Sequence, residues 1–332
     1  MAHLVIVTGG AGFIGSNIVA RLAKRGDADV VVADWLGSAE EAKWANIAQH
    51  DVADIVAPEA LLAYLDANAS RVAAIVHMGA ISSTTETDVD KIIESNLRAS
   101  QRLWDWAAQR QTPFIYASSA ATYGDGSLGF ADDNAYEALL KLRPLNAYGY
   151  SKKLFDLYAS RGASRGAAPP KWSGLKFFNV YGPNEQHKGA QKSVVAHMYP
   201  RASAGEAVTL FRSHNPAYAD GGQMRDFIYV RDCVDVVEWL LAEGRGGGIL
   251  NVGTGKARSF RDLADSLFAA IETKPRIEFV DTPQAIRARY QYFTEAEMSR
   301  IRDLGYDRQF TPIEDGVADY VRRYLAGAHP HA

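Results

Sequence analysis

Two side chains that can exchange protons lie four residues apart near the middle of the chain. Tyr148 and Lys152 open a stretch whose apolar residues recur at helical spacing, so both side chains should lie on one face of a helix. A neighbouring ammonium group lowers the pKa of a phenol, so Tyr148 could take a proton from a bound hydroxyl group. Tyrosine and lysine also meet at this spacing by chance, and a core or surface tyrosine is the alternative. The weight of the pair therefore depends on its surroundings.

A serine precedes this pair at a suitable place. Ser119 follows the apolar run Phe114–Ser118, which is typical of a buried strand. A hydroxyl group at the carboxyl end of such a strand could hydrogen-bond the same oxygen that Tyr148 deprotonates. The alternative is that Ser119 only caps the end of the strand.

A glycine-rich segment joins the first apolar run to the first helical pattern. Residues Thr8–Gly15 have G-x-x-G-x-x-G spacing and lie between the run Leu4–Thr8 and the pattern Gly15–Arg25. Such glycines permit a tight turn and let the backbone approach a pyrophosphate at the positive end of the helix. An ordinary glycine-rich turn is the alternative. However, Asp34 follows Gly15 by 19 residues, where an acid can bond the ribose of a dinucleotide, so the segment predicts dinucleotide binding.

Two charged side chains bear on which dinucleotide binds. Asp34 suits the free 2′-hydroxyl group of NAD and would repel the 2′-phosphate of NADP. Lys43 could neutralise such a phosphate. From the residues alone, a solvated helix face is the preferred interpretation of Lys43.

A parallel sheet is needed to bring these residues together. Short β-branched runs alternate with longer helical patterns, which is typical of an α/β fold with a doubly wound, Rossmann-type parallel sheet. Residues 161–173 are rich in Gly, Pro and Ser and predict a loop, whereas 179–224 looks like an insertion that contains one helix, Ser193–Ala204. Amphipathic helices are expected from Ser259 onward. The runs expected as strands are Leu4–Thr8, Val30–Ala33, Ala74–His77, Phe114–Ser118, Gly174–Phe178 and Gly248–Val252.

The composition agrees with a folded α/β protein. The 332 residues are 47% apolar and 23% charged, enough for two compact units or one large unit with an extra lobe. A net charge of −3 offers no general attraction to nucleic acid or an anionic membrane, so neither is expected as a partner. The single cysteine, Cys233, excludes an internal disulfide and Cys-rich metal sites, and we expect no metal. With no signal-like or membrane-spanning segment, we expect a reducing, cytoplasmic location.

Four motifs together resemble the extended short-chain dehydrogenase/reductase family of nucleotide-sugar enzymes over nearly the whole chain. They are Thr8–Gly15, Ser118–Gly124, Tyr148-x-x-x-Lys152 and Phe178–Pro183. Further segments resemble one branch of it, the epimerases that act at C6 of ADP-glyceromanno-heptose. These are Ile81–Glu86, Asn179–Gly189, Arg225–Phe227 and Arg289–Thr294. The resemblance implies an isomerase with a Rossmann domain and a smaller α/β substrate-binding lobe.

The resemblance also implies a mechanism with two proton-exchanging groups. A cofactor that stays bound, NADP or alternatively NAD, would accept hydride from C6 of ADP-D-glycero-D-manno-heptose. Reduction of the transient keto sugar on its other face would give the L-glycero form. Tyr148 matches one acid/base and Lys188 the other, while Lys152 matches the lysine that holds the nicotinamide ribose and Ser119 assists. A solvated basic loop is the alternative for Lys188 and its neighbour His187.

Further residues match the family's binding positions. Arg225 is the candidate for the substrate diphosphate, because a guanidinium group can meet phosphate oxygens in a fork; a structural pair with an acid such as Asp232 is the alternative. The cofactor positions are Gly9, Gly12, Phe13, Ile14, Gly15, Asp34, Trp35, Lys43, Met78, Gly79, Ala80, Ile81, Ser82, Asn96, Lys152, Val180 and Lys188. The substrate positions are Asn179, Ala190, His197, Phe211, Arg212, Ser213, His214, Arg225 and Tyr290.

The resemblance also suggests how the chain divides and what it serves. Residues 1–178 and 222–257 would form the dinucleotide-binding domain, and residues 179–221 and 258–332 the substrate-binding lobe. The family further implies a homo-oligomer. Its place in carbohydrate metabolism would be the supply of a lipopolysaccharide precursor.

Other functions stay open at this point. The segment between Ser213 and Arg225 looks longer than in short family members, and residues 280–288 replace a more usual sequence. A dehydratase would need an Asp-Glu pair where this chain has Ala120-Ala121. A UDP-hexose 4-epimerase would share the Tyr, Ser and Lys set without needing Lys188, and a non-catalytic NADP-binding sensor would need none of that set.

Overall fold

The structure is a computed structural model that describes residues 3–84, 86–287, 290–327 and 329–332. Three residues of the segments quoted above, Thr85, Ala288 and Arg289, lie outside the described residues.

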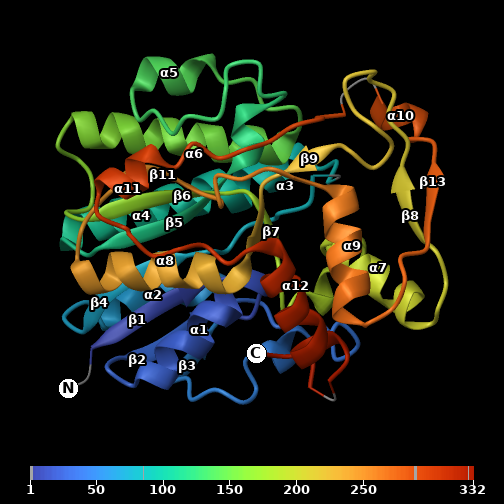
Figure 1. Cartoon of the computed structure of the whole chain (residues 1–332). Helices are drawn as coiled ribbons and strands as arrows, with labels where there is room; N and C mark the ends of the chain where they lie inside the picture. Colours follow the sequence, from blue (N-terminus) through green and yellow to red (C-terminus); the bar gives the residue numbers. More distant parts are fainter. Residues whose placement is uncertain (1–2, 85, 288–289, 328) are drawn as a thin grey trace.

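A seven-stranded parallel sheet forms the centre of the protein (Figure 1). Its strands run in the order β11-β6-β5-β4-β1-β2-β3. Strand β1 therefore lies between β2 and β4. Strands β2 and β3 follow on one side of β1, and β4, β5, β6 and β11 follow on the other side. The strand order thus reverses at β1, and such sheets bind dinucleotides at the point of reversal. The strands are β1 Leu4–Thr8, β2 Asp29–Ala33, β3 Asp54–Val56, β4 Val72–His77, β5 Phe114–Ser119, β6 Trp172–Phe177 and β11 Gly248–Val252.

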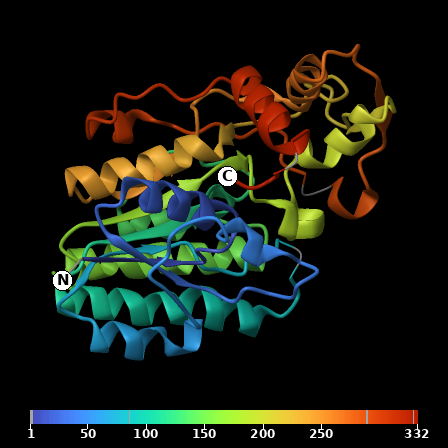
Figure 2. The same ribbon diagram turned by 90° about the horizontal axis from the view of Figure 1, so that it is seen from below.

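Helices cover both faces of the sheet because its strands are apolar on both faces. Val5 and Val7 of β1 pack with helices α1 and α8, whereas Leu4 and Ile6 of the same strand pack with α2, α4 and α6. Figure 2 shows α4 and α8 on opposite sides of the sheet. These helices are α1 Phe13–Arg25, α2 Leu61–Ala67, α4 Ala99–Arg110, α6 Ala147–Ser164 and α8 Val230–Glu243, with the shorter α3 Val89–Ile92 and α5 Tyr136–Lys141 between them in the chain.

A second apolar cluster builds a smaller lobe at one end of the sheet (Figure 1). Three short strand pairs, β8 with β13, β7 with β10 and β9 with β12, join distant parts of the chain there. The helices are α7 Val194–Ser203, α9 Phe260–Ala270, α10 Gln284–Arg287 and α12 Ile313–Tyr320. Helix α11 Ser299–Asp303 lies instead beside β11 of the large sheet. The strands are β7 Asn179–Tyr181, β8 Val208–Phe211, β9 Met224–Arg225, β10 Phe227–Tyr229, β12 Arg258–Ser259 and β13 Ile277–Val280.

Short helical turns complete the fold, and several carry residues of the site. The 3₁₀ turns are η1 Lys43–Asn46, η2 Pro58–Ala60, η4 Ala120–Tyr123 and η5 Gln186–Gln191. Two π-helical turns are η3 Ile93–Arg98 and η6 Val321–Leu325.

The predicted fold class is confirmed, with differences in detail. The sheet has a seventh strand, Asp54–Val56, which the apolar runs of the sequence do not predict. Helix α6 continues to Ser164, so it occupies the first part of the predicted loop 161–173, and the next strand already begins at Trp172.

The division into two domains stays a prediction, and one segment crosses it. Ile301 and Tyr306 belong to residues 258–332, which we assigned to the lobe. Both side chains nevertheless lie in the cluster formed by the sheet, α1 and α8. Across the described ranges, every helix is too short or too polar to cross a membrane.

Candidate active site

The glycine turn leaves no room for side chains. Gly9 has a φ of +63°, and a Cβ atom on it would lie 2.7 Å from the Cα of Gly79. Gly79 belongs to the Met78–Ser82 segment after β4, so two cofactor segments predicted from the sequence meet here. The turn leads directly into α1, whose free N–H groups form a site for negative charge. The backbone of this turn comes close to its neighbours only because its glycines have no Cβ atom, as expected for a turn that binds a pyrophosphate.

The acid at the end of β2 is held on both of its oxygens. Asp34 Oδ2 accepts a hydrogen bond from the backbone N–H of Ala11 at 3.0 Å. Its other oxygen lies 2.7 Å from Lys43 Nζ, which also donates to the Trp35 carbonyl oxygen at 2.9 Å. Lys43 is therefore not on a solvated helix face, the interpretation preferred from its sequence. It stands beside the acid, while Trp35 is 57% exposed.

The predicted Tyr, Ser and Lys set comes together at the carboxyl end of β5. Tyr148 lies in the first turn of α6, and its phenol shares a hydrogen bond with the Ser119 side chain. Burial raises the pKa of Tyr148, and the bond from Ser119 opposes this rise. Lys152, one turn further along, donates to the carbonyl oxygen of Ala117 at 2.7 Å, and burial lowers its pKa to about 8. Ser119 also accepts from the N–H of Ala121, so the predicted capping role and the predicted site role coexist.

A close helix approach makes this arrangement possible. Gly149 follows Tyr148, and a Cβ atom on it would lie 2.6 Å from the carbonyl oxygen of Ala121 in η4. Because glycine has no such atom, α6 can lie directly against the turn that follows Ser119. Asn146 caps the helix by accepting from the N–H of Gly149 at 2.8 Å.

Asn96 links the cofactor segment to the same helix. Its side-chain oxygen accepts from the N–H of Ile81 at 2.8 Å, and its Nδ2 donates to the Ile81 carbonyl oxygen at 2.9 Å. The same Nδ2 also donates to Ser151 Oγ on α6 at 3.1 Å. Asn96 is buried on the π-helical turn η3, so its assigned cofactor role would be exerted through the Met78–Ser82 segment.

Side-chain amides fasten the segment before Lys188 to the cofactor end of the sheet. Asn17 of α1 donates to the Pro183 carbonyl oxygen at 3.1 Å, and Asn184 donates to Ser16 Oγ at 2.9 Å. Asn46 donates to the carbonyl oxygens of Ala11, in the glycine turn, and of Asn184. The segment is thus tied to the first turn of α1.

Lys188 consequently lies beside the glycine turn rather than in solvent. Its Nζ is 5.2 Å from the centre of the Phe13 ring, at the start of α1. Burial lowers the pKa of Lys188, and the buried carboxylate of Glu185 opposes this effect. Within the described residues, no carboxylate forms an ion pair with Lys188. An amine with a lowered pKa suits proton exchange near neutral pH.

The candidate diphosphate residue is a cation between two aromatic rings. The guanidinium carbon of Arg225 lies 5.6 Å from the Phe260 ring centre and 5.5 Å from that of Tyr290. Phe211 packs edge-on against Tyr290 at 6.0 Å. The alternative pairing with Asp232 is wrong, since that carboxylate binds the N–H and hydroxyl groups of Thr311. Within the described residues, no carboxylate forms an ion pair with Arg225.

Comparisons with known proteins agree with this geometry. The family model described as the NAD dependent epimerase/dehydratase family matches residues 5–253. The chain belongs to this family. It is 51% identical over 331 residues, 99% of this chain and 100% of the other, to the ADP-L-glycero-D-manno-heptose-6-epimerase of Nitratidesulfovibrio vulgaris. It is 44% identical to the Fusobacterium nucleatum protein of the same name, covering 97% of this chain and 98% of that one. The crystal structure of the Helicobacter pylori protein of that name superposes with a TM-score of 0.79 at 26% identity, covering 96% and 95% of the two chains.

Other residues predicted for this epimerase-family site lie in three further places. Ala190 and His197 meet, since the carbonyl oxygen of Ala190 lies 3.2 Å from His197 Nε2. Asn179 and Val180 form β7 beside β10. In the segment 211–214, the Ser213 hydroxyl donates to the Asn215 carbonyl oxygen, and the His214 N–H donates to the hydroxyl group of the distant Tyr292. The Ser213 and His214 assignments stay predictions, because these contacts are internal to the lobe.

Sequence reasoning missed several polar residues behind the site. Asp156 and Lys176 form a fully buried ion pair at 2.8 Å. Asp226, next to Arg225, accepts from the N–H groups of Thr254, Gly255 and Ala296 and so binds three chain segments together. Two features of the sequence could have indicated these residues. Asp156 follows Lys152 by four residues, on the same face of the helix, and Lys176 is a charged residue inside an apolar strand. Phe260, which is 35 residues from Arg225 in the chain, left no such signal.

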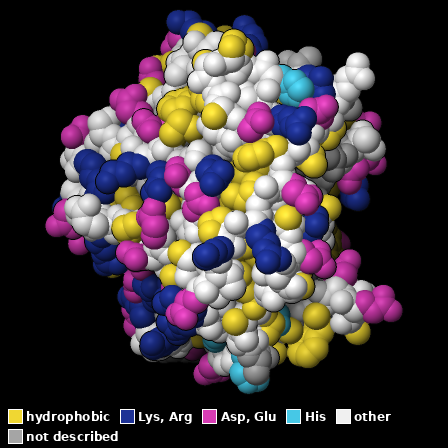
Figure 3. Space-filling view, turned by 45° about the vertical axis from the view of Figure 1, so that its right-hand side comes forward, with side chains coloured by type: hydrophobic (Ala, Val, Ile, Leu, Met, Phe, Trp, Pro, Cys, Tyr) yellow, Lys and Arg dark blue, Asp and Glu magenta, His cyan; other side chains and the backbone are white. Residues whose placement is uncertain are grey.

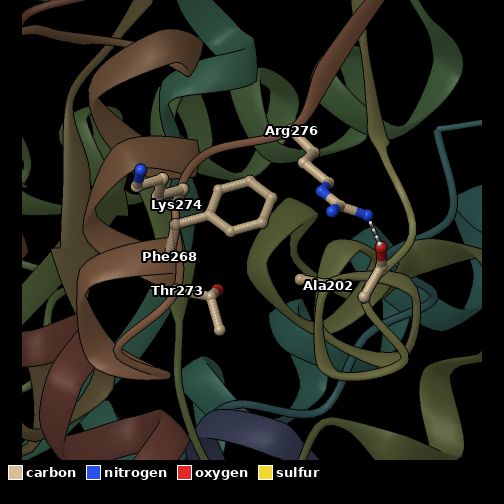
Figure 4. A pocket seen from close by; sticks show the side chains of 6 residues that line it. Ala202, Phe268, Thr273, Lys274 and Arg276 are labelled. Carbon is tan, nitrogen blue, oxygen red and sulfur yellow. Dashed lines mark hydrogen bonds between the residues drawn. The ribbon is translucent and has the colours of Figure 1, made fainter.

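Neither the cavity described next nor the surface charge indicates a further part of the site. A cavity of about 360 Å³ near the ends of α7 and α9 is lined by Ala202, Gly205, Phe268, Thr273, Lys274 and Arg276 (Figure 4). It contains none of the predicted site residues. Figure 3 shows cationic and anionic side chains interspersed over one face, in keeping with the small net charge. No group of three His, Cys, Asp or Glu residues suited to a metal ion occurs within the part of the chain that the structure describes.

Proposed function

We propose that the protein is an ADP-L-glycero-D-manno-heptose-6-epimerase, which interconverts the D-glycero and L-glycero forms of ADP-manno-heptose. The observation that carries this proposal is its similarity, over essentially both full lengths, to a protein of that name at 51% identity. The surroundings of Lys188 support it, because inversion through a planar keto intermediate benefits from a proton donor on each side.

The residues around the glycine turn would hold the dinucleotide. The turn and the start of α1 would receive the pyrophosphate, Asp34 and Lys43 the adenosine ribose, and Lys152 the nicotinamide ribose. When bound, the nicotinamide supplies the acceptor and donor of hydride. The side chains described below would exchange the protons and bind the substrate.

Tyr148 would exchange the proton of the C6 hydroxyl group on one face. Its hydrogen bond with Ser119 helps to stabilise a phenolate, and a cationic Lys152 one turn away does the same. Ser119 would also orient the sugar oxygen. Lys188 would donate or accept the proton when the other face of the keto sugar reacts, with its lowered pKa allowing both roles.

Arg225 would bind the diphosphate of the substrate. Its buried guanidinium group has aromatic neighbours and, among the described residues, no carboxylate partner, so it is ready to accept an anion. Burial lowers its pKa, an effect that a bound phosphate would reverse. Tyr290 and Phe211 would form an adjoining aromatic wall. Ala190 and His197 would contact the substrate from the segment that carries Lys188.

One assay tests the proposal directly. Purified protein is incubated with ADP-D-glycero-D-manno-heptose without added reductant, and the C6 configuration is followed by proton NMR. We expect conversion towards a mixture of both epimers. No change at C6 together with C4 epimerisation of a UDP-hexose would assign the protein to the 4-epimerases. No turnover of either sugar, with dinucleotide still bound, would favour a sensor.

We further propose NADP as the dinucleotide, with NAD as the alternative. The ion pair of Lys43 with Asp34 supports this choice, because it offsets the repulsion between the carboxylate and a 2′-phosphate. Replacing Lys43 with alanine should weaken NADP binding about tenfold or more and change NAD binding by less than about threefold. Titration of both dinucleotides, followed by nicotinamide fluorescence after reduction, measures the two affinities. Equal losses for both dinucleotides would contradict the choice of NADP, as would release of NAD alone from the denatured protein.

A further inference from the structure

A fully buried ion pair lies directly behind the proposed proton-exchanging residues. Asp156 of α6 and Lys176 of β6 are both 0% exposed, with 2.8 Å between Oδ2 and Nζ. Asp156 follows Lys152 by one helical turn. Neither residue has a role in the sequence motifs or in the proposed chemistry.

Asp156 and Lys152 together grip three successive residues of β5. Asp156 Oδ1 accepts from the Tyr116 hydroxyl at 3.0 Å, and its Oδ2 accepts from the Ser118 hydroxyl at 2.8 Å. Lys152 Nζ donates to the carbonyl oxygen of Ala117, the residue between them, at 2.7 Å. One face of α6 therefore fixes the end of the strand immediately before Ser119.

Lys176 grips the turn on the other side of Ser119. Its Nζ donates to Thr122 Oγ1 at 2.6 Å, and the Thr122 hydroxyl donates to the Ser119 carbonyl oxygen at 2.8 Å. The same Nζ lies 4.8 Å from the centre of the Tyr123 ring. Asp156 thus fixes the residues that precede Ser119, and Lys176 fixes the turn that follows it. The ion pair joins Asp156 to Lys176.

Stability alone is a poor reason for such a pair. Removing two charges from water costs several kcal/mol per ion, and well-packed apolar residues of similar volume are often as stable or more stable. A fully bonded buried network instead fixes one geometry of the groups it touches. On the basis of the proposed function, we propose that Asp156 and Lys176 are positioning residues, which hold Ser119 in place and provide a balanced charge beside Lys152.

The charges near Lys152 make this proposal specific. Asp156 is its anionic neighbour on α6 and favours the ammonium form, whereas Lys176 on β6 is a second cation bound to the same carboxylate. Tyr148 of α6 and Tyr116 of β5 are uncharged near neutral pH, because burial raises the pKa of both. His77 of β4 is also neutral, since burial and the charge of Lys152 lower its pKa to about 3. Asp156 and Lys176 are therefore the two charged side chains whose removal by substitution should change the pKa of Lys152.

The test uses opposite charge changes in the full-length protein. NADP affinity is measured between about pH 6 and pH 10 for wild type, Asp156→Asn, Lys176→Met and the double variant. NADP binding should weaken at alkaline pH, where Lys152 loses its proton. In Asp156→Asn this weakening should begin about one pH unit lower than in wild type, because the anion that stabilises the Lys152 ammonium is gone. In Lys176→Met it should begin about one pH unit higher, because a neighbouring cation is gone. The double variant should fall between them, with kcat reduced about tenfold and KM changed less than about threefold, because the Ser119 turn has lost its anchor.

Lys153→Met is the matched control. Lys153 lies on the same helix, and its Nζ holds the carbonyl oxygens of Leu140 and Leu142, away from β5. This variant should lose stability without moving the pH dependence. Shifts of both single variants in the same direction, or no shift, would overturn the charge role, and wild-type kcat in the double variant would overturn the positioning role. If a single variant does not fold, the double variant decides through kcat, since it removes both charges of the Asp156–Lys176 pair and leaves neither of them buried without the other.

The two proposals fail in different ways. NADP titration needs no sugar, so failure of the wild type to convert ADP-heptose would contradict the proposed function and leave the pH test intact. In that event kcat is measured on the sugar nucleotide that the wild type does convert.

Discussion

At the scale of single residues, the position of Lys188 carries the most chemical information. Without the surrounding motif, a solvated basic loop is the preferred interpretation of Lys188 and His187. The structure instead puts its amine over the Phe13 ring, and the side chains of Asn17 and Asn184 hold the segment there. Lys188 is therefore placed by contacts of its segment with α1, which lies far from it in the chain.

Replacing Lys188 with methionine should remove proton exchange but little packing, since methionine keeps much of the apolar stem. We expect kcat to fall by about 10²- to 10⁴-fold, the usual contribution of a general acid or base. NADP affinity should stay within about threefold of wild type. Steady-state kinetics and dinucleotide titration measure the two quantities. Lys192→Met, four residues further along, is the control and should keep nearly full activity; near-normal turnover by Lys188→Met would remove its assigned role.

At the scale of elements, local patterns predicted the parts of the fold that local chemistry determines. The strand at Leu4–Thr8, the glycine turn and the helix that follows were all readable, because apolar periodicity and glycine spacing are local. Strand β3 was not, since Asp54 and Ile55 are exposed and only Val56 of its three residues is buried. The end of α6 was misjudged because Gly162 is a weak helix former. Contact of that turn with Trp104 keeps it helical.

The site follows the same rule. Tyr148, Lys152, Ser119 and the glycine turn could be predicted, because each belongs to a short motif. The Asp156–Lys176 pair and the Phe260 ring beside Arg225 could not be paired by sequence alone, because strand order and lobe packing bring them together. Tertiary contacts, rather than motifs, determine how the motif residues are held.

The contact of α6 with η4 yields a prediction at this scale. A methyl group on Gly149 would meet the Ala121 carbonyl oxygen at 2.6 Å, so Gly149→Ala should push α6 away and lengthen the bond between Ser119 and Tyr148. We expect kcat to fall about 10- to 100-fold, because small misplacements of reacting groups are costly. NADP should remain bound. Gly162→Ala in the last turn of the same helix should leave kcat unchanged; equal effects of the two variants on kcat would show that the loss comes from the helix as a whole.

At the scale of the whole molecule, one chain segment connects the lobe with the apolar core of the sheet. The chain leaves the lobe after Ala296 and returns across the sheet, where Ile301 and Tyr306 are buried beside α8. Tyr306 lies 5.2 Å from the Trp239 ring centre and 5.6 Å from that of Phe310. The chain then re-enters the lobe as α12. Because this passage anchors both parts, we expect them to unfold together.

Replacing Tyr306 with alanine tests this coupling. Loss of a buried aromatic ring should lower the free energy of unfolding by about 3–5 kcal/mol. Tyr306→Phe should cost less than about 1 kcal/mol, since it keeps the ring packing. Urea denaturation followed by circular dichroism and by tryptophan fluorescence should give coincident transitions for the wild type and both variants, shifted as one for alanine. A separate early transition in Tyr306→Ala, with the remainder unfolding at the wild-type urea concentration, would show that the lobe and the sheet are independent units.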